Sequence, residues 1–149
     1  MNKYQEFYES NFPNLIGNHG EIGMPEGAVN FCEAYKVLLM EEFCIQYFGK
    51  DLFISEETIQ NINDAIKNER SESPEEIINK EGYLVRMPIS NLKFYQHEVG
   101  IEKLNEIDGN SPVSLVKYKN EIILMNGYHR LLKNIADGVG EVSGFLLDL

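Results

Sequence analysis

The chain has 149 residues, of which 43% are hydrophobic and 25% charged, so it can bury a core and is not a disordered protein. Its 24 acidic residues face 13 Lys and Arg, and a net charge of -11 argues against a protein that wraps on the phosphates of a nucleic acid. Residues 1–80 carry 15 acidic against 6 basic side chains, whereas residues 81–149 carry 9 against 7. This asymmetry indicates that the chain joins two different parts.

The first part begins with a short stretch that fits a helix with an aromatic face, followed by a loop after Pro13. A second helix is predicted over Pro25–Phe48, where apolar residues recur every three to four positions and Gly49 follows as a stop. Cys32 and Cys44 fall in this helix, roughly 18 Å apart. That separation is too long for a disulfide, so we expect two buried free thiols and no zinc site.

Two further helices are predicted before residue 82. Ser55 opens the first one, and its apolar stripe consists of Ile59, Ile62 and Ile66. In the second, Ser73 is the expected N-cap, Pro74 takes the first helical position and Glu76 can close a capping box. Gly82 ends this helix. We therefore expect residues 1–82 to be an acidic, mainly helical extension.

The periodicity changes from Tyr83 onward. The expected order is strand 83–89, helix 99–107, strands 112–118 and 121–125, helix 129–137 and strand 141–147. Lys119 and Asn120 alone separate the two middle strands, which predicts a hairpin. The β-α-β-β-α-β order predicts an α+β fold, with a compact mixed-sheet unit over residues 83–149. No long linker precedes this unit, so we expect the helical extension to pack on it.

The segment that carries chemistry lies where the strand ending at Met125 turns into a helix. Gly127 permits an abrupt turn, and His129 and Arg130 stand in the first helical turn. Free N–H groups and the helix dipole favour an anion there, while two cations oppose the dipole by roughly 0.3–1 kcal/mol. A phosphate would relieve this conflict. The alternative is that Arg130 pairs with a carboxylate of the N-terminal part and that His129 is an ordinary histidine.

Three sequence phrases occur in a recognisable order: Pro88–Leu92, Ser111–Val116 and Asn126–Leu131, with Gly138–Gly140 before the last strand. Through them residues 83–149 resemble the ParB/sulfiredoxin fold. The resemblance implies a pocket for ATP or CTP, with Mg²⁺, in which the Asn126–Arg130 turn lies against the phosphates. The family's motif there is Asp-Gly-x-His-Arg-Leu, and here it reads Asn126-Gly127-Tyr128-His129-Arg130-Leu131.

Carried over position by position, the resemblance names Asn126, Gly127, Tyr128, His129 and Arg130 as the nucleotide-binding residues. Gly127 would let the backbone approach the phosphate, the next three amides would bind it, and the His129 and Arg130 side chains would balance its charge. Sulfiredoxins have their catalytic cysteine where this chain has Tyr128, so sulfinic-acid reductase activity is not expected. Tyr128 could either contact the ligand or fill the space of that cysteine.

Other residues near this turn are weaker candidates. His97, Glu98 and Glu121 are expected to be solvated side chains, and no catalytic residue or metal ligand can be named. The aromatic residues of the N-terminal part either form a wall for a substrate or pack in the core. These residues are Tyr4, Phe7, Tyr8 and Phe12.

The leading functional hypothesis is a nucleotide- or phosphate-binding protein, with NTP-dependent phosphotransfer or hydrolysis as its possible activity. DNA partition is not expected, because the chain is acidic and has no helix-turn-helix after the last strand. The alternative is an inactive acidic interaction module of the immunity, antitoxin or inhibitor type, which binds a basic partner. The sequence has no signal-peptide pattern and no long apolar run, so we expect a cytoplasmic location without membrane contact.

Overall fold

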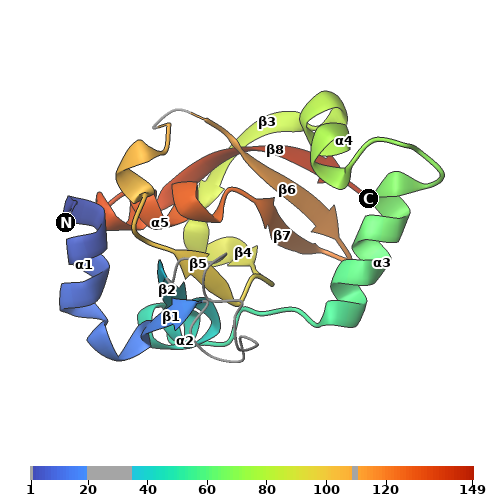
Figure 1. Cartoon of the computed structure of the whole chain (residues 1–149). Coiled ribbons are helices and arrows are strands. Elements are labelled where there is room, and N and C mark those ends of the chain that lie inside the picture. Colours follow the sequence, from blue (N-terminus) through green and yellow to red (C-terminus); the bar gives the residue numbers. More distant parts are fainter. Residues whose placement is uncertain (1, 20–34, 109–110) are drawn as a thin grey trace, which may run out of the picture.

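The central feature of the computed structural model is a five-stranded mixed sheet of strand order β3-β8-β6-β7-β4 (Figure 1). The structure describes residues 2–19, 35–108 and 111–149. The strands are β3 (Tyr83–Pro88), β4 (Leu92–Lys93), β6 (Val113–Tyr118), β7 (Glu121–Asn126) and β8 (Glu141–Asp148). β6 is the middle strand, parallel to β8 and antiparallel to β7. β3 and β4 are the two edges of this sheet.

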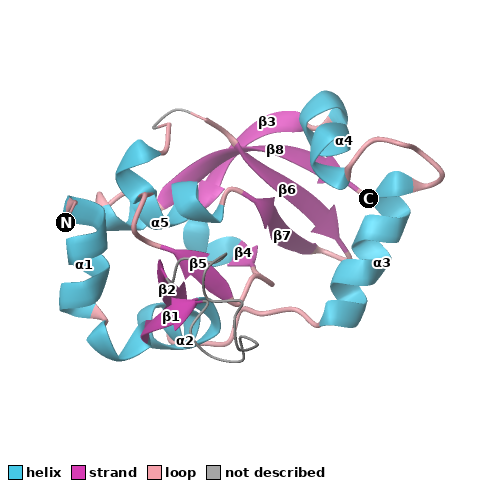
Figure 2. Ribbon diagram, viewed as in Figure 1, coloured by secondary structure: helices cyan, strands magenta, loops and turns pink. Residues whose placement is uncertain are grey.

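Helices cover the sheet on its two faces. The α-helices are α1 (Lys3–Asn11), α2 (Met40–Phe48), α3 (Glu56–Lys67), α4 (Pro74–Glu81) and α5 (Tyr128–Ala136). Short 3₁₀ turns lie at Pro13–Leu15, Ile89–Asn91 and Leu104–Glu106. Figure 2 shows α3 and α4 at one end of the molecule and α1 and α2 at the other. No helix among the described residues combines the length and apolar character needed to cross a bilayer.

Side chains alternate along β6, so that neighbouring residues enter two different cores. Val116 packs with the isoleucines of α3 and α4, for example Ile62 and Ile77. Leu115 packs in the larger core, which contains Leu131 of α5 and aromatic residues of α1 and α2. In that core the Tyr8 hydroxyl donates to the Leu132 carbonyl, which ties α1 to α5.

The capping and turn signals predict local structure correctly in several places. The Ser73 side chain accepts a hydrogen bond from the Glu76 N–H at 3.2 Å, and Pro74 opens α4 as expected. Lys119 and Asn120 connect β6 to β7 with φ of 50° and 65°, which is the geometry of a tight hairpin. The first helix, α3, α5, β3 and β8 also confirm the corresponding predictions.

The helix expected over Pro25–Phe48 is wrong for its middle part. Residues 35–39 form strand β2 (Tyr35–Leu39), and only Met40–Phe48 is helical. β2 lies between β1 (Ile16–His19) and β5 (Glu98–Gly100) in a separate antiparallel sheet. Hydrogen bonding to two partner strands thus outweighs the helical spacing of the apolar residues. Residues 25–34, with Cys32, lie outside the described residues, whereas Cys44 is a buried free thiol.

β1 and β5 correct two further predictions. β1 occupies part of the loop expected after Pro13, so residues 1–82 are not purely helical. The helix expected over Val99–Ile107 is absent, because Glu98–Gly100 pairs with β2 and Leu104–Glu106 is a 3₁₀ turn. Val99, Ile101 and Leu104 are nevertheless buried, through strand pairing and a turn. The β2–β5 pairing also crosses the boundary expected at residue 82.

Candidate functional site

The turn into α5 is built around Gly127, which follows β7 and caps the helix with a left-handed φ of 106°. A Cβ at this position would lie 2.5 Å from the Val113 Cγ1 atom, so only glycine fits against β6. The Asn126 side-chain oxygen accepts a hydrogen bond from the Gly127 N–H at 2.7 Å. The glycine is therefore required by the turn and by its packing on Val113.

Tyr128 points into the core and is only 2% exposed. Its hydroxyl donates to the Leu124 carbonyl at 3.0 Å and accepts from the N–H groups of Tyr95 at 2.9 Å and Gln96 at 3.3 Å. Burial is the main reason that the pKa of this phenol lies above its usual value. The ring has no open face for a base, which leaves the second of the two roles considered for it, that of filling the interior.

His129 lines a cavity of about 450 Å³ between α5 and the three-stranded sheet. The other lining residues are Tyr35, Gln96, Glu98, Gly100, Glu102 and Lys103. Glu98 pairs with His19, whose Nδ1 lies 2.7 Å from Oε2 of the carboxylate. Burial lowers the pKa of His129, which favours the neutral form of its ring. A neutral imidazole beside two glutamates is a poor environment for a phosphate.

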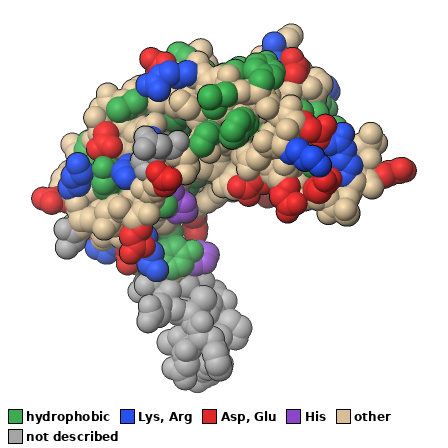
Figure 3. Space-filling view, turned by 90° about the horizontal axis from the view of Figure 1, so that it is seen from above, with side chains coloured by type: hydrophobic (Ala, Val, Ile, Leu, Met, Phe, Trp, Pro, Cys, Tyr) green, Lys and Arg blue, Asp and Glu red, His purple; other side chains and the backbone are tan. Residues whose placement is uncertain are grey.

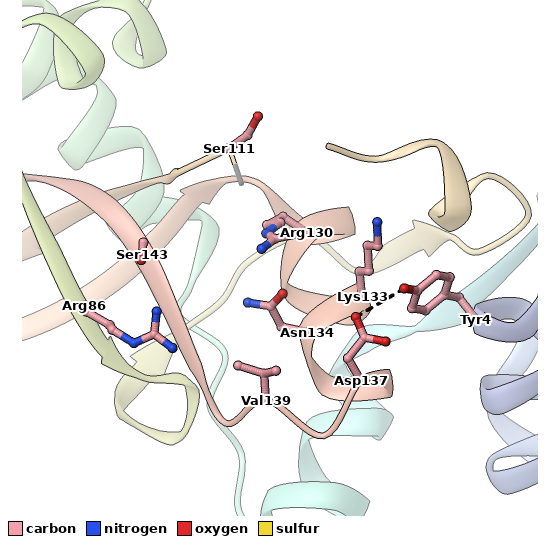
Figure 4. Close-up of a pocket in the computed structure, with 9 residues that line it drawn as sticks. All are labelled: Tyr4, Arg86, Ser111, Arg130, Lys133, Asn134, Asp137, Val139 and Ser143. Atoms are coloured by element: carbon pink, nitrogen blue, oxygen red, sulfur yellow. Dashed lines mark hydrogen bonds between the residues drawn. The ribbon is translucent and has the colours of Figure 1, made fainter. Parts of the chain in front are cut away.

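Arg130 lines a different cavity, of about 440 Å³ (Figure 4). The other lining residues are Tyr4, Arg86, Ser111, Lys133, Asn134, Asp137, Val139 and Ser143. Arg130 and three of these residues lie on one face of α5 and its C-cap Asp137, because positions 130, 133, 134 and 137 follow the helical repeat. The Arg130 guanidinium donates to the Asp108 carbonyl at 3.3 Å. Among the described residues, no carboxylate of the N-terminal part lies within ion-pair distance of it.

The opposite wall of this cavity comes from β3 and β8, where Arg86 pairs in register with Ser143. Figure 4 shows the side chains of Arg86, Arg130 and Asn134 directed into the space between β8 and α5. The Nε atom of Arg86 lies 3.2 Å from a carboxylate oxygen of Glu141, an exposed pair. The Asn134 amide donates to the Glu141 carbonyl at 3.0 Å. Two guanidinium groups and one amide therefore share this cavity.

The remaining wall is formed by Tyr4 and the last turn of α5. The Tyr4 hydroxyl donates to Asp137 at 3.2 Å, and the Lys3 ammonium lies 3.8 Å from the same carboxylate. Lys133 donates to the Ile107 carbonyl at 2.8 Å, and its ammonium lies 5.3 Å from the centre of the Tyr4 ring. Asp137 is thus already paired, and Lys133 adds a third cation to the cavity. All four N-terminal aromatic residues pack in or against the large core, and Tyr4 also lines the cavity.

The weaker candidates do not join this cavity. His97 lies 3.4 Å from a carboxylate oxygen of Glu41 and is exposed, and Glu121 is exposed at the hairpin. Among the residues that the structure describes, no three His, Cys, Asp or Glu side chains are placed to hold a metal ion. The residues proposed from the resemblance therefore separate: Arg130 joins a basic cavity, His129 an acidic one, and Tyr128 the core.

Sequence reasoning missed Arg86, Lys133 and Asn134. The two residues of α5 could have been found, because they stand three and four positions after Arg130 in a predicted helix. Arg86 carries no such signal, since its position beside α5 depends on the pairing of β3 with β8.

No protein-family model matches this chain, and neither a curated protein nor a solved structure gives a significant match.

Proposed function

We propose that this chain binds a phosphate-bearing ligand, of the nucleotide class, in the cavity between α5 and the β3–β8 edge of the sheet. The observation that carries the proposal is the presence of Arg86, Arg130 and Lys133 around one cavity in a chain of net charge -11. Guanidinium groups match the planar pairs of oxygens on phosphates, and they keep their charge at any physiological pH.

The charges around the cavity support an anionic ligand. Three cations face one cavity, and Asp137 is the one carboxylate among its described lining residues. Glu141 pairs with Arg86 at the exposed rim, while Lys133 and Arg130 donate to neutral backbone carbonyls. A phosphate would supply negative charge to all three side chains and accept several hydrogen bonds.

The resemblance to the ParB/sulfiredoxin fold supports the same ligand class, because it places Arg130 beside nucleotide phosphates. The resemblance implies a phosphate at the Gly127 backbone, whereas in this proposal the phosphate lies in the cavity beside α5. We therefore propose ATP or CTP as the ligand. Asp137 is the single carboxylate among the described lining residues, and it is already paired, so Mg²⁺ would enter as a complex with the phosphates.

The test is calorimetric titration of the folded chain with ATP and CTP, each with and without Mg²⁺. We expect a dissociation constant in the micromolar range, which corresponds to a binding free energy on the order of −8 kcal/mol. Arg86→Ala and Arg130→Ala should each weaken binding at least about tenfold, because each removes a charged hydrogen bond. A phosphate-release assay on the same complexes then tests for hydrolysis.

Two control variants make this test specific. His129→Ala changes the residue next to Arg130, but His129 lines the other cavity and not the proposed nucleotide cavity. Lys119→Ala removes a positive charge from the distant β6–β7 hairpin. Both should bind nucleotide like the original chain. Loss of binding in His129→Ala with retention in Arg86→Ala would instead favour the Gly127 turn as the phosphate site. Absence of binding for every nucleotide would refute the proposal.

A further inference from the structure

β3 is an edge strand whose outer side has no strand partner among the described residues. It pairs with β8 along its whole length of six residues, and every one of those residues is exposed or half-exposed. The other edge, β4, has only two residues and is largely buried. Long exposed edges are sites where a further strand can add, because their backbone groups lack partners.

The hydrogen-bond pattern shows which backbone groups of β3 face outward. The N–H of Ile89 donates to the Gly140 carbonyl, just beyond the pairing of Pro88 with Glu141. Antiparallel pairs alternate between bonded and non-bonded positions. The backbone groups of Leu84 and Arg86 are therefore directed away from β8. Pro88 occupies the next outward position, where its missing N–H costs the sheet nothing.

The side chains at the start of this edge are apolar and exposed. Tyr83 is 54% exposed and Leu84 is 64% exposed, and Leu84 is the most exposed large hydrophobic residue of the described chain. Exposed apolar residues at an open strand edge are typical of a site that binds another chain. They offer contacts to a strand that pairs with β3.

The helix that leads into this edge, α4, is acidic and carries Glu75, Glu76 and Glu81 against Lys80. Residues 56–81, which include α3 and α4, carry eight carboxylates against three basic side chains. Two of those basic side chains are already paired, Arg70 with Glu81 and Lys80 with Glu72. Figure 3 shows many acidic side chains, with some basic ones among them, at the side of the molecule where α3 and α4 lie. A partner strand that pairs with the start of β3 would lie close to the carboxylates at the end of α4.

We propose that β3 binds an extended, basic segment of a partner protein, which pairs with Leu84 and Arg86 as an added strand of the sheet. The backbone supplies the pairing, Tyr83 and Leu84 supply apolar contact, and the acidic helices select for Lys and Arg. A second copy of this chain is disfavoured as the occupant, because it would bring the same acidic helices together. Arg86 also lines the nucleotide cavity with its side chain, but the strand pairing uses its backbone, and Tyr83 and Leu84 do not line the cavity.

The first experiment measures fluorescence anisotropy of a labelled peptide of about ten residues that alternates Lys and Val, a pattern with strand periodicity. We expect saturable binding to the full chain. A peptide that alternates Glu and Val should not bind, and neither should the Lys-Val peptide with a proline at its centre. Binding of the proline peptide at equal strength would show that only charge is recognised and would overturn the proposal.

Two variants at one position separate backbone pairing from side-chain contact. Leu84→Pro removes the outward N–H, whereas Leu84→Ala keeps it and removes only the apolar side chain. Leu84→Pro should weaken peptide binding by at least about tenfold, and Leu84→Ala should weaken it less. Equal affinity of Leu84→Pro and the original chain would contradict strand addition.

Hydrogen exchange on the unmodified chain provides a test that does not depend on folding of a variant. The Leu84 amide should exchange rapidly in the free protein and become protected when the Lys-Val peptide is added. An amide that stays unprotected at saturating peptide would refute pairing with β3. Protection that instead follows protein concentration, together with a dimer in sedimentation, would assign this edge to a second copy and overturn the proposed partner.

Discussion

His129 and Arg130 are adjacent in the first turn of α5, yet their side chains line two different cavities. Successive residues of a helix point about 100° apart, so that neighbours in sequence are not neighbours on a face. The cavity of His129 contains two glutamates, and that of Arg130 contains two further cations. Substitution of Arg130 should therefore weaken nucleotide binding, whereas substitution of His129 should not, although the two residues form one motif in the sequence.

Gly127→Ala should destabilise the chain by about 2–4 kcal/mol, from the left-handed backbone and from crowding. The new methyl would lie 2.5 Å from Val113 Cγ1, at a φ of 106°. Urea denaturation measures the loss. Gly138→Ala is a matched control, because its φ is also positive at 78° but no atom lies within 4 Å of the added carbon. It should cost only about 1–2 kcal/mol, and an equal cost for both variants would contradict the role of Val113.

Tyr128→Phe should destabilise the chain by about 1–3 kcal/mol, because buried backbone groups lose their partner. The Tyr95 and Gln96 N–H groups would lose an acceptor, and the Leu124 carbonyl would lose a donor. Urea denaturation again measures the change, and calorimetry with ATP should show unchanged binding in the folded variant. A variant of full stability that fails to bind nucleotide would show that the hydroxyl contacts the ligand instead.

His129 should titrate below the ordinary histidine value of 6.5, because burial disfavours its charged form. The unfolded chain then binds more protons than the native chain as pH falls below that value, so the contribution of His129 lowers stability there. Above about pH 7 the contribution disappears, since both states are neutral. An NMR titration of the imidazole signals reads the pKa directly.

The matching stability measurement compares the chain with His129→Gln at about pH 7 and about pH 5.5. The variant should lose less stability on acidification, because glutamine does not titrate. A pKa for His129 at or above 6.5, or an equal loss in both proteins, would contradict the effect of burial.

The thiol of Cys44 should resist modification in the native chain. Burial, with smaller effects from the charges of Asp51 and Glu41, raises its pKa to about 12. The reactive thiolate is therefore scarce at about pH 8 and is also inaccessible. In a Cys32→Ser variant, an aromatic disulfide reagent should react at a rate that follows unfolding and increases with urea. Rapid reaction without denaturant would show that α2 opens readily or that this thiol is exposed.

Local signals in the sequence predict those parts of the fold that depend on neighbouring residues. The Ser73 cap, the proline after it and the two-residue hairpin at Lys119 each determine a short segment by their own chemistry. The isoleucine stripe of α3 likewise identifies a buried face. These features need no distant partner, so the sequence is sufficient to predict them.

Pairing between distant segments explains what the sequence did not reveal. Tyr35, Leu38 and Leu39 match a helical spacing, and their strand conformation depends on partners in β1 and β5. The same limit applies to the candidate site. Arg130 could be chosen from its own helix, but Arg86 reaches the cavity only through the register of β3 on β8. The inward direction of Tyr128 depends equally on the acceptors and donors offered by residues 95, 96 and 124.

The contact between α1 and α5 also affects how the chain folds. Tyr8 bonds to Leu132, 124 positions later, so α1 lacks this partner until α5 has been synthesised. Val37 and Gly100 are likewise paired across 63 positions. Long closures of this kind slow folding, because chain entropy is lost before the contacts form. In nascent chains of this protein, the segment around α1 should therefore become protease-resistant only after α5 has emerged from the ribosome.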